Sequence, residues 1–97
     1  MSVYDSAFNE VRQSGASLRC ARLSELLESL GFKISNGKSV NHKVFVHPEL
    51  PNFFSSSYNC GHGKKGEVQP NYLSNVLRVL RQNEADLRKF LGENDDD

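Results

Sequence analysis

Two sets of aliphatic residues at helical spacing, separated by a segment of a different pattern, restrict the folds open to this chain. Both sets follow the i, i+3, i+4, i+7 spacing that places side chains along one side of an α-helix. The first set is Leu23, Leu26, Leu27 and Leu30, and the second is Leu73, Val76, Leu77 and Leu80. Gly31 after the first set favours a left-handed C-cap, and Pro70 before the second suits the first turn of a helix. Each predicted helix needs an apolar surface to pack on, which the segment between them has to provide.

That middle segment is predicted to form a three-stranded antiparallel sheet. Residues 32–35 and 40–47 alternate between apolar and polar side chains, as strands do. The dipeptide Asn36-Gly37 between them favours a type I′ hairpin turn, because both central positions of that turn need positive φ. A loop with prolines then leads to a third strand, expected from residue 53 to residue 58 or 60.

Both ends of the chain are predicted to extend this core. Residues 2–13 carry apolar side chains at helical spacing, so an added N-terminal helix is expected within residues 1–16. Ser17 is the predicted N-cap of the leucine-rich helix that follows. The last helix is expected to continue past Asn83 and to end at Gly92.

The expected element order is therefore α-α-β-β-β-α, in one α+β domain over residues 1–97 whose sheet is covered by helices on one face. Lysines and arginines balance aspartates and glutamates at 12 each, so the net charge indicates no partner. The middle of the chain is nevertheless rich in lysine. The acidic residues 93–97 are expected to form a disordered, solvated tail.

The two cysteines, Cys20 and Cys60, show no Cys-x-x-Cys spacing, and a chain of this length needs no disulfide to fold. The N-terminal residues 1–13 do not have the apolar run of a signal peptide. No apolar stretch approaches the ~18 residues of a membrane span. These features predict a cytoplasmic protein that does not contact a membrane, with both thiols free.

His42 is the candidate for chemistry within the predicted second strand. An imidazole can take and return a proton at cellular pH. RNA needs little more, because its 2′-hydroxyl attacks the adjacent phosphate once it is deprotonated. Lys43 beside it is a candidate for stabilising charge on the phosphate. Strict alternation, however, places His42 on the same face as Val44 and Val46, which is typical of a half-buried structural histidine, so both interpretations stay open.

The other two histidines have weaker patterns. His47 precedes a proline at the predicted strand end, which favours an exposed residue without a special role. His62 lies with Lys64 and Lys65 in a glycine-rich loop before a helix, where backbone N–H groups can converge on an anion. A solvated basic turn is the equal alternative. The histidines and Cys60 match no zinc-site spacing, so no metal site and no cofactor are predicted.

Three segments of the chain, residues 23–32, 41–48 and 62–73, together resemble the HicA family of small bacterial toxins, which are messenger-RNA interferases. The resemblance covers a core of residues 23–83. It implies an α-β-β-β-α fold like that of double-stranded-RNA-binding domains, with His42 as the catalytic residue and no metal. It also implies a HicB-type antitoxin as the neutralising protein partner.

Two functions are weighed from the sequence. The first is a metal-independent endoribonuclease that cuts messenger RNA, with His42 moving the proton and Lys43, Lys64, Lys65 and His62 at the phosphates. The second is a catalytically silent module that binds RNA or a protein on the same fold. A further group of apolar residues exceeds what one small core needs and indicates a homodimer or antitoxin interface. This group is Leu87, Phe90 and Leu91.

Overall fold

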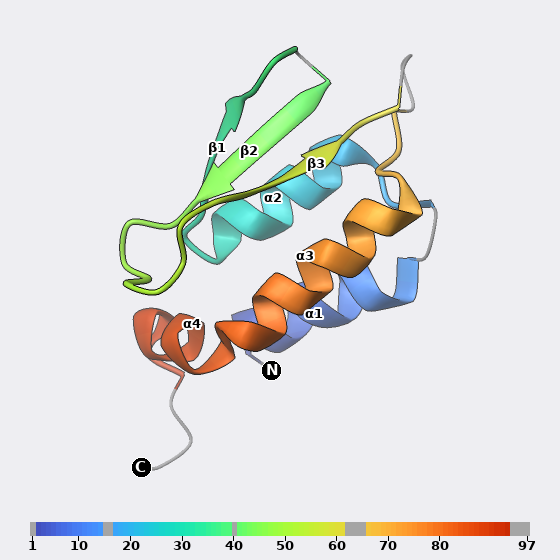
Figure 1. Cartoon of the computed structure of the whole chain (residues 1–97). Coiled ribbons are helices and arrows are strands. Elements are labelled where there is room, and N and C mark those ends of the chain that lie inside the picture. The colour runs from blue at the N-terminus through green and yellow to red at the C-terminus, as the bar shows by residue number, and fades with distance from the viewer. Residues whose placement is uncertain (1, 15–16, 40, 62–65, 94–97) are drawn as a thin grey trace.

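The computed structural model describes residues 2–14, 17–39, 41–61 and 66–93. The elements are α1 (Val3–Ser14), α2 (Cys20–Ser29), β1 (Lys33–Asn36), β2 (His42–Val46), β3 (Ser56–Asn59), α3 (Pro70–Gln82) and α4 (Glu84–Leu91). The strands form one antiparallel sheet in the order β1-β2-β3, and the helices lie on one face of it (Figure 1). The predicted α+β class and the helix-covered antiparallel sheet are confirmed. None of the described helices is long and apolar enough to cross a membrane.

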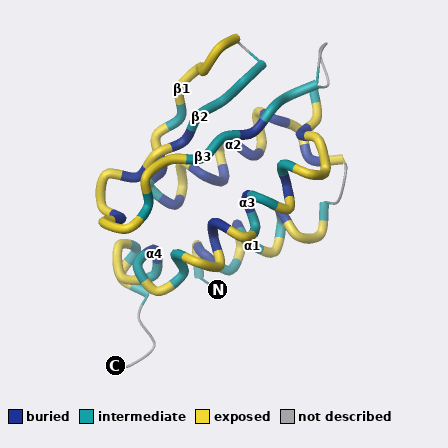
Figure 2. Tube along the Cα trace, viewed as in Figure 1, coloured by how far each residue is buried: buried dark blue, intermediate teal, exposed yellow. Residues whose placement is uncertain are grey.

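The strand register decides which side chains face the helices. In the centre of the sheet Phe45 pairs with Ile34 on β1, and Lys43 pairs with Tyr58 on β3. Phe45 and Tyr58 are both fully buried, so their side of the sheet faces the helices. Figure 2 shows the buried residues gathered between the sheet and the helices.

The opposite face of the sheet carries Val44, Val46 and His42, because successive side chains of a strand alternate. Val46 is 38% exposed whereas Phe45 is 0% exposed, so this face is open to solvent. His42 therefore shares a face with the two valines, as alternation predicted, and both His42 and Val44 are half-buried there. The larger aromatic side chain determines which face is buried, since it removes more apolar area from water.

The first two helices follow the sequence pattern, but their caps differ from it. The N-cap of α2 is Arg19, and the hydroxyl of Ser17 instead donates a hydrogen bond to the Ser14 carbonyl oxygen at 2.7 Å. The prediction of Ser17 as N-cap is wrong. At the other end of α2 Gly31 has φ of 95°, the left-handed conformation that was expected. A Cβ there would also overlap the ring of Phe90. Both the backbone conformation and the lack of space therefore favour glycine at this position.

The connection between β1 and β2 is not the predicted type I′ turn. Asn36 pairs with Lys43 across the hairpin, and the chain between them forms a longer loop. Among the described residues only Gly31 and Gly92 have positive φ, so Asn36-Gly37 does not adopt the backbone of that turn. Gly37 serves a different purpose: a Cβ on this residue would overlap the imidazole of His42.

The C-terminal helix is divided in two at Asn83, where one continuous helix was expected. Asn83 has φ of −111° and ψ of 16°, and its side-chain amide donates to the Val79 carbonyl oxygen at 2.9 Å. The break turns α4 so that Leu87 is fully buried, while Phe90 stays 46% exposed. Gly92 ends α4 with φ of 74°, as predicted.

The third strand begins at Ser56, later than predicted. Phe53 leaves the sheet to stack near Phe45, with ring centroids 5.9 Å apart, and Phe54 is 94% exposed. An aromatic side chain that packs beneath the sheet contributes more buried area than another pair of strand residues. The serine-rich segment that follows gave little indication of where pairing starts.

A disulfide joins Cys20, the first residue of α2, to Cys60, the residue after β3, with the Cα atoms 5.7 Å apart. The prediction of two free thiols is wrong. Spacing along the chain was a poor guide, because the sheet and α2 bring two residues 40 positions apart within reach of each other.

Candidate functional site

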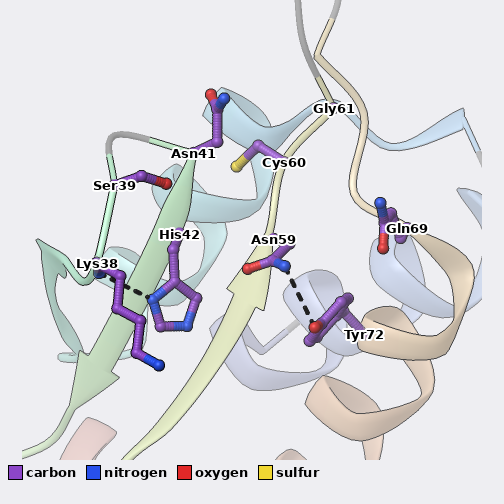
Figure 3. A pocket seen from close by; sticks show the side chains of 9 residues that line it. All are labelled: Lys38, Ser39, Asn41, His42, Asn59, Cys60, Gly61, Gln69 and Tyr72. Carbon is purple, nitrogen blue, oxygen red and sulfur yellow. Dashed lines mark hydrogen bonds between the residues drawn. The ribbon is translucent and has the colours of Figure 1, made fainter.

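A cavity of about 500 Å³ lies at the end of the sheet where β2 begins and β3 ends. Four segments contribute to its wall: the loop before β2, the start of β2, the end of β3 and the first turn of α3 (Figure 3). The lining residues are Lys38, Ser39, Asn41, His42, Asn59, Cys60, Gly61, Gln69 and Tyr72. Most of the lining residues have polar side chains, and His42, which the sequence analysis singled out, is among them. Concave sites with convergent polar groups are where ligands bind.

His42 is the first residue of β2, and the preceding loop curls around its ring. The His42 N–H donates to the Ser39 carbonyl oxygen at 3.1 Å, and the His42 carbonyl oxygen accepts from the Gly37 N–H at 2.6 Å. The Lys38 N–H donates to Nδ1 of the ring at 3.3 Å. The missing side chain of Gly37 leaves the space that the ring occupies. The imidazole is thus positioned by backbone groups and is only half-buried.

The hydrogen bond from Lys38 also determines where the ring carries its proton. A backbone N–H can only donate, so Nδ1 of His42 accepts and the neutral ring has its proton on Nε2. Nε2 lies on the side of the ring away from the Lys38 amide (Figure 3).

Asn59 and Tyr72 complete the wall beyond His42. Asn59 is the direct cross-strand partner of His42, and its Nδ2 donates to the Tyr72 hydroxyl at 3.3 Å. Figure 3 shows Asn59 between the imidazole and the phenol ring. The other amide atom, Oδ1, is buried and has no hydrogen-bond partner among the described residues. Buried acceptors are nearly always paired, so an unpaired one at a cavity marks a place for a ligand or water.

Sequence reasoning missed both of these residues. Tyr72 was not among the candidate residues, yet it is half-buried and lines the cavity. Asn59 stands opposite His42 only because of the strand register, which the serine-rich third strand did not reveal. Tyr72 could have been found more easily than Asn59. It follows Pro70 in the first turn of a predicted helix, and first-turn side chains border the loop that precedes the helix.

The predicted lysines are distributed differently from the expectation. Lys43 alternates to the face opposite His42, and its Nζ donates to Asn36 Oδ1 at 2.7 Å. Lys38 lines the cavity in its place. The remaining predicted residues, His62, Lys64 and Lys65, lie outside the described residues. Within the described part of the chain no group of three or more potential metal ligands occurs.

His47 is the clearest error at the level of a single residue. It is only 4% exposed, not the exposed strand-end residue that was expected. Its Nε2 donates to the Leu30 carbonyl oxygen at 2.9 Å, and its Nδ1 accepts the Glu49 N–H at 3.1 Å. The ring stands edge-on to Phe32 and Phe90, with centroids 4.9 and 4.7 Å away. His47 joins the end of α2 to the sheet and is structural.

The fold and the site define a small α+β protein with a polar, histidine-bearing cavity at one end of an antiparallel sheet. No family model matches the chain, and no curated protein or solved structure shows significant similarity to it. The geometry of this cavity and the chemistry of its lining residues are therefore the evidence for a function.

Proposed function

We propose that this protein is a metal-independent endoribonuclease of the HicA type, a messenger-RNA interferase built on a fold like that of double-stranded-RNA-binding domains. The observation that carries the proposal is the position of His42. Its imidazole lines a cavity at the end of the sheet and is held by backbone groups of the preceding loop. A half-exposed, positioned imidazole is the group that transfers protons to and from RNA.

The reaction uses the nucleophile that RNA already contains. The 2′-hydroxyl attacks the adjacent phosphorus as His42 takes its proton, and the His42 imidazolium returns that proton to the 5′-oxygen of the next nucleotide as the bond between this oxygen and phosphorus breaks. The products are a 2′,3′-cyclic phosphate and a 5′-hydroxyl. A positioned general base contributes about 10²–10⁴-fold to such a step. The internal nucleophile is the reason why no metal-bound water is required.

The hydrogen bond from the Lys38 N–H to Nδ1 of His42 has to be broken before His42 can act as a base, and RNA binding would break it. To act as a base at Nε2, His42 must carry a proton at Nδ1, where the Lys38 N–H now donates. A phosphate oxygen is a better acceptor for that N–H than a neutral imidazole, because the hydrogen bond is then charge-assisted. RNA binding thus draws the Lys38 amide away and frees the ring to change its tautomer.

Phosphate charge is stabilised by nearby cations. We assign the role beside His42 to Lys38, which lines the same cavity, because the Lys43 ammonium is directed to the other face of the sheet. The N-terminal end of α3, at Gln69 and Tyr72, adds a partial positive charge to the cavity wall. The sequence prediction that His62, Lys64 and Lys65 bind flanking phosphates is part of the same proposal, and these three residues lie outside the described part of the chain.

The biological setting follows from the same proposal. An enzyme that destroys messenger RNA acts in the cytoplasm and needs a neutralising partner, for which a HicB-like antitoxin is the candidate. The exposed side of Phe90 on α4 is part of the surface that this antitoxin, or a second copy of the chain, would cover. The Cys20–Cys60 disulfide would be under reducing conditions there, and the enzyme has to function with both thiols free.

One observation favours the alternative of a silent RNA- or protein-binding module on the same fold. The Lys38 N–H holds His42 in the tautomer that cannot accept a proton at Nε2. If no ligand displaces this amide, the ring binds but does not catalyse.

Cleavage assays with matched variants distinguish the two functions. Purified protein is incubated with a labelled RNA in the presence of EDTA, beside His42→Ala and Lys38→Ala. Lys33→Ala is the control for the lysine, because Lys33 is an exposed residue at the other end of the sheet. The nuclease proposal expects cleavage by the wild type and by Lys33→Ala. It expects a loss of at least about 10²-fold in His42→Ala. Unchanged cleavage by a folded His42→Ala protein would rule out this mechanism.

A further inference from the structure

We infer that the cavity beside His42 binds one unstacked nucleobase of a single-stranded RNA and that Asn59 reads the edge of this base. The inference rests on the proposed function, because it takes RNA as the substrate. It adds the form of RNA that is bound, the side chains that select the base, and the nucleotide whose identity matters for cleavage.

The shape of the site favours a nucleobase that is not stacked and paired in an RNA duplex. The cavity measures about 500 Å³, inside the ~300–1,000 Å³ range of pockets that hold small organic ligands. A base in a duplex is stacked and paired, and its edge cannot enter a pocket of this kind. Proteins that read RNA sequence accordingly bind single strands, whose bases can be splayed out.

The wall offers the groups that a base requires. Tyr72 supplies an aromatic ring, on which any base can stack. Asn59 and Gln69 supply side-chain amides, each with one acceptor and two donor hydrogens, which match the pattern of a base edge. The side chain of Gln69 does not cap α3, although Gln69 is the N-cap residue, and so stays available to a ligand.

Asn59 is the residue that gives the pocket a preference. Its Nδ2 is used by the hydrogen bond to the Tyr72 hydroxyl, which fixes the orientation of the amide. This leaves Oδ1 as an acceptor, buried and without a partner among the described residues. The group that satisfies it must be a donor. The exocyclic amino groups of adenine and cytosine are such donors, whereas uracil has a carbonyl oxygen in place of that amino group and only its ring N3–H to donate.

The position of Asn59 relative to His42 assigns the base to one side of the cut. The two residues are cross-strand partners, so the pocket adjoins the imidazole directly. A nucleotide whose base occupies the pocket brings its own 2′-hydroxyl and 3′-phosphate toward His42. The base on the 5′ side of the cleaved bond is therefore the one that Asn59 selects.

Nucleotide binding by the whole wild-type chain tests this inference without any cleavage. The probes are 3′-AMP, 3′-CMP and 3′-UMP, which carry base, ribose and the phosphate at the proposed position, and binding is followed by NMR titration. The expected result is about five- to tenfold tighter binding of 3′-AMP or 3′-CMP than of 3′-UMP, the size of effect that one net hydrogen bond produces. Equal affinity for the three nucleotides, or a preference for 3′-UMP, would overturn the assignment of Asn59.

Variants separate the two parts of the pocket. Asn59→Ala should remove the difference between nucleotides, and Tyr72→Ala should weaken all of them by about tenfold or more. Tyr72→Phe keeps the ring and should retain most of the affinity. Asn71→Ala is the control, because Asn71 is an exposed neighbour on α3 that does not line the cavity. If a variant does not fold, the wild-type titration alone decides.

The same experiments distinguish a failure of this inference from a failure of the nuclease. If 3′-nucleotides bind with the expected preference, and single-stranded RNA binds but is not cleaved, the nuclease is overturned and the base pocket stands. Cleavage that shows no preference for the 5′-side base and is unaffected by Asn59→Ala would overturn the pocket and leave the nuclease. Binding of duplex RNA as tight as that of the single strand also contradicts the pocket.

Discussion

The two ends of this molecule differ in how completely their polar groups are hydrogen-bonded. At the end formed by α1 and α4, the polar groups are paired. The Tyr4 hydroxyl donates to the Leu80 carbonyl oxygen at 2.9 Å, and the Arg88 guanidinium lies over the Tyr4 ring. Arg88 also joins Asp5 at 2.7 Å and Glu84 at 2.8 Å. This end stabilises the fold.

The cavity end has polar groups with weak partners or none. His42 accepts one long hydrogen bond from a loop, and Asn59 Oδ1 has no partner in the described part of the chain. Such features lower stability locally and are typical of functional sites, where a ligand completes the pairing. The proposed site therefore lies where polar groups lack strong partners, whereas the paired groups at the α1–α4 end stabilise the fold.

The largest effect is expected from the bond that ties the cavity wall to the helices. Reduction of the Cys20–Cys60 disulfide should lower the free energy of unfolding by about 4 kcal/mol, because its 40-residue separation restricts the unfolded chain. Urea unfolding with and without a thiol reductant measures this difference, with a Cys20→Ala/Cys60→Ala variant that should not respond to the reductant. A difference below about 1 kcal/mol would mean that the bond contributes little and that the stability comes from the α1–α4 end alone.

A second effect concerns the loop that holds His42. Gly37→Ala should reduce RNA cleavage by about 10²-fold, because the new Cβ overlaps the imidazole and displaces it, and a shift of about 1 Å in a catalytic group has this effect. Gly37 does not have positive φ, so alanine brings no backbone strain. The unfolding free energy should therefore change little, and urea unfolding of the same variant checks this. Full activity in Gly37→Ala would show that the ring does not need this position.

The smallest effect is expected at the opposite end. Tyr4→Phe should lower the free energy of unfolding by about 1 kcal/mol, since it removes the hydrogen bond to the Leu80 carbonyl oxygen, and should leave RNA cleavage unchanged. Chemical unfolding and the cleavage assay together measure this. A loss of cleavage in a folded Tyr4→Phe protein would contradict the separation of the two ends.

The same tyrosine predicts a dependence of stability on alkaline pH. Burial, and secondarily the nearby Glu84 carboxylate, raise the pKa of Tyr4 from 10.0 to about 12. The native state therefore keeps the phenol neutral at pH values where the unfolded chain ionises. This contribution is complete below pH 10 and is lost as the pH rises from 10 towards 12. Unfolding curves across that range should be less pH-dependent in Tyr4→Phe than in the wild type.

The features that the sequence predicted correctly depend on local backbone interactions. Those that it missed depend on contacts between residues far apart in the chain. Gly31, Pro70 and Gly92 act through their own backbone, and each occupies the predicted place. The burial of His47 depends on Leu30 and Phe90, which only the complete fold brings to it. Local pattern alone could not anticipate this.

The candidate site shows the same division. His42 was identified from its own chemistry, and the open face of the sheet on which it lies supports that choice. Asn59 could not be found without the register of β2 and β3, which depends on burying Phe45 and Tyr58. The pairing of Cys20 with Cys60 likewise needed the arrangement of α2 against the end of β3. Tertiary packing, rather than propensity, decides the position of Asn59 and the pairing of the two cysteines.

The most direct test of the central claim is an analysis of the RNA ends that the purified protein produces in the presence of EDTA. The account predicts fragments with 2′,3′-cyclic phosphate and 5′-hydroxyl ends from the wild type and none from a folded His42→Ala variant. Intact RNA after incubation with the wild type, or fragments that His42→Ala produces equally well, would contradict it.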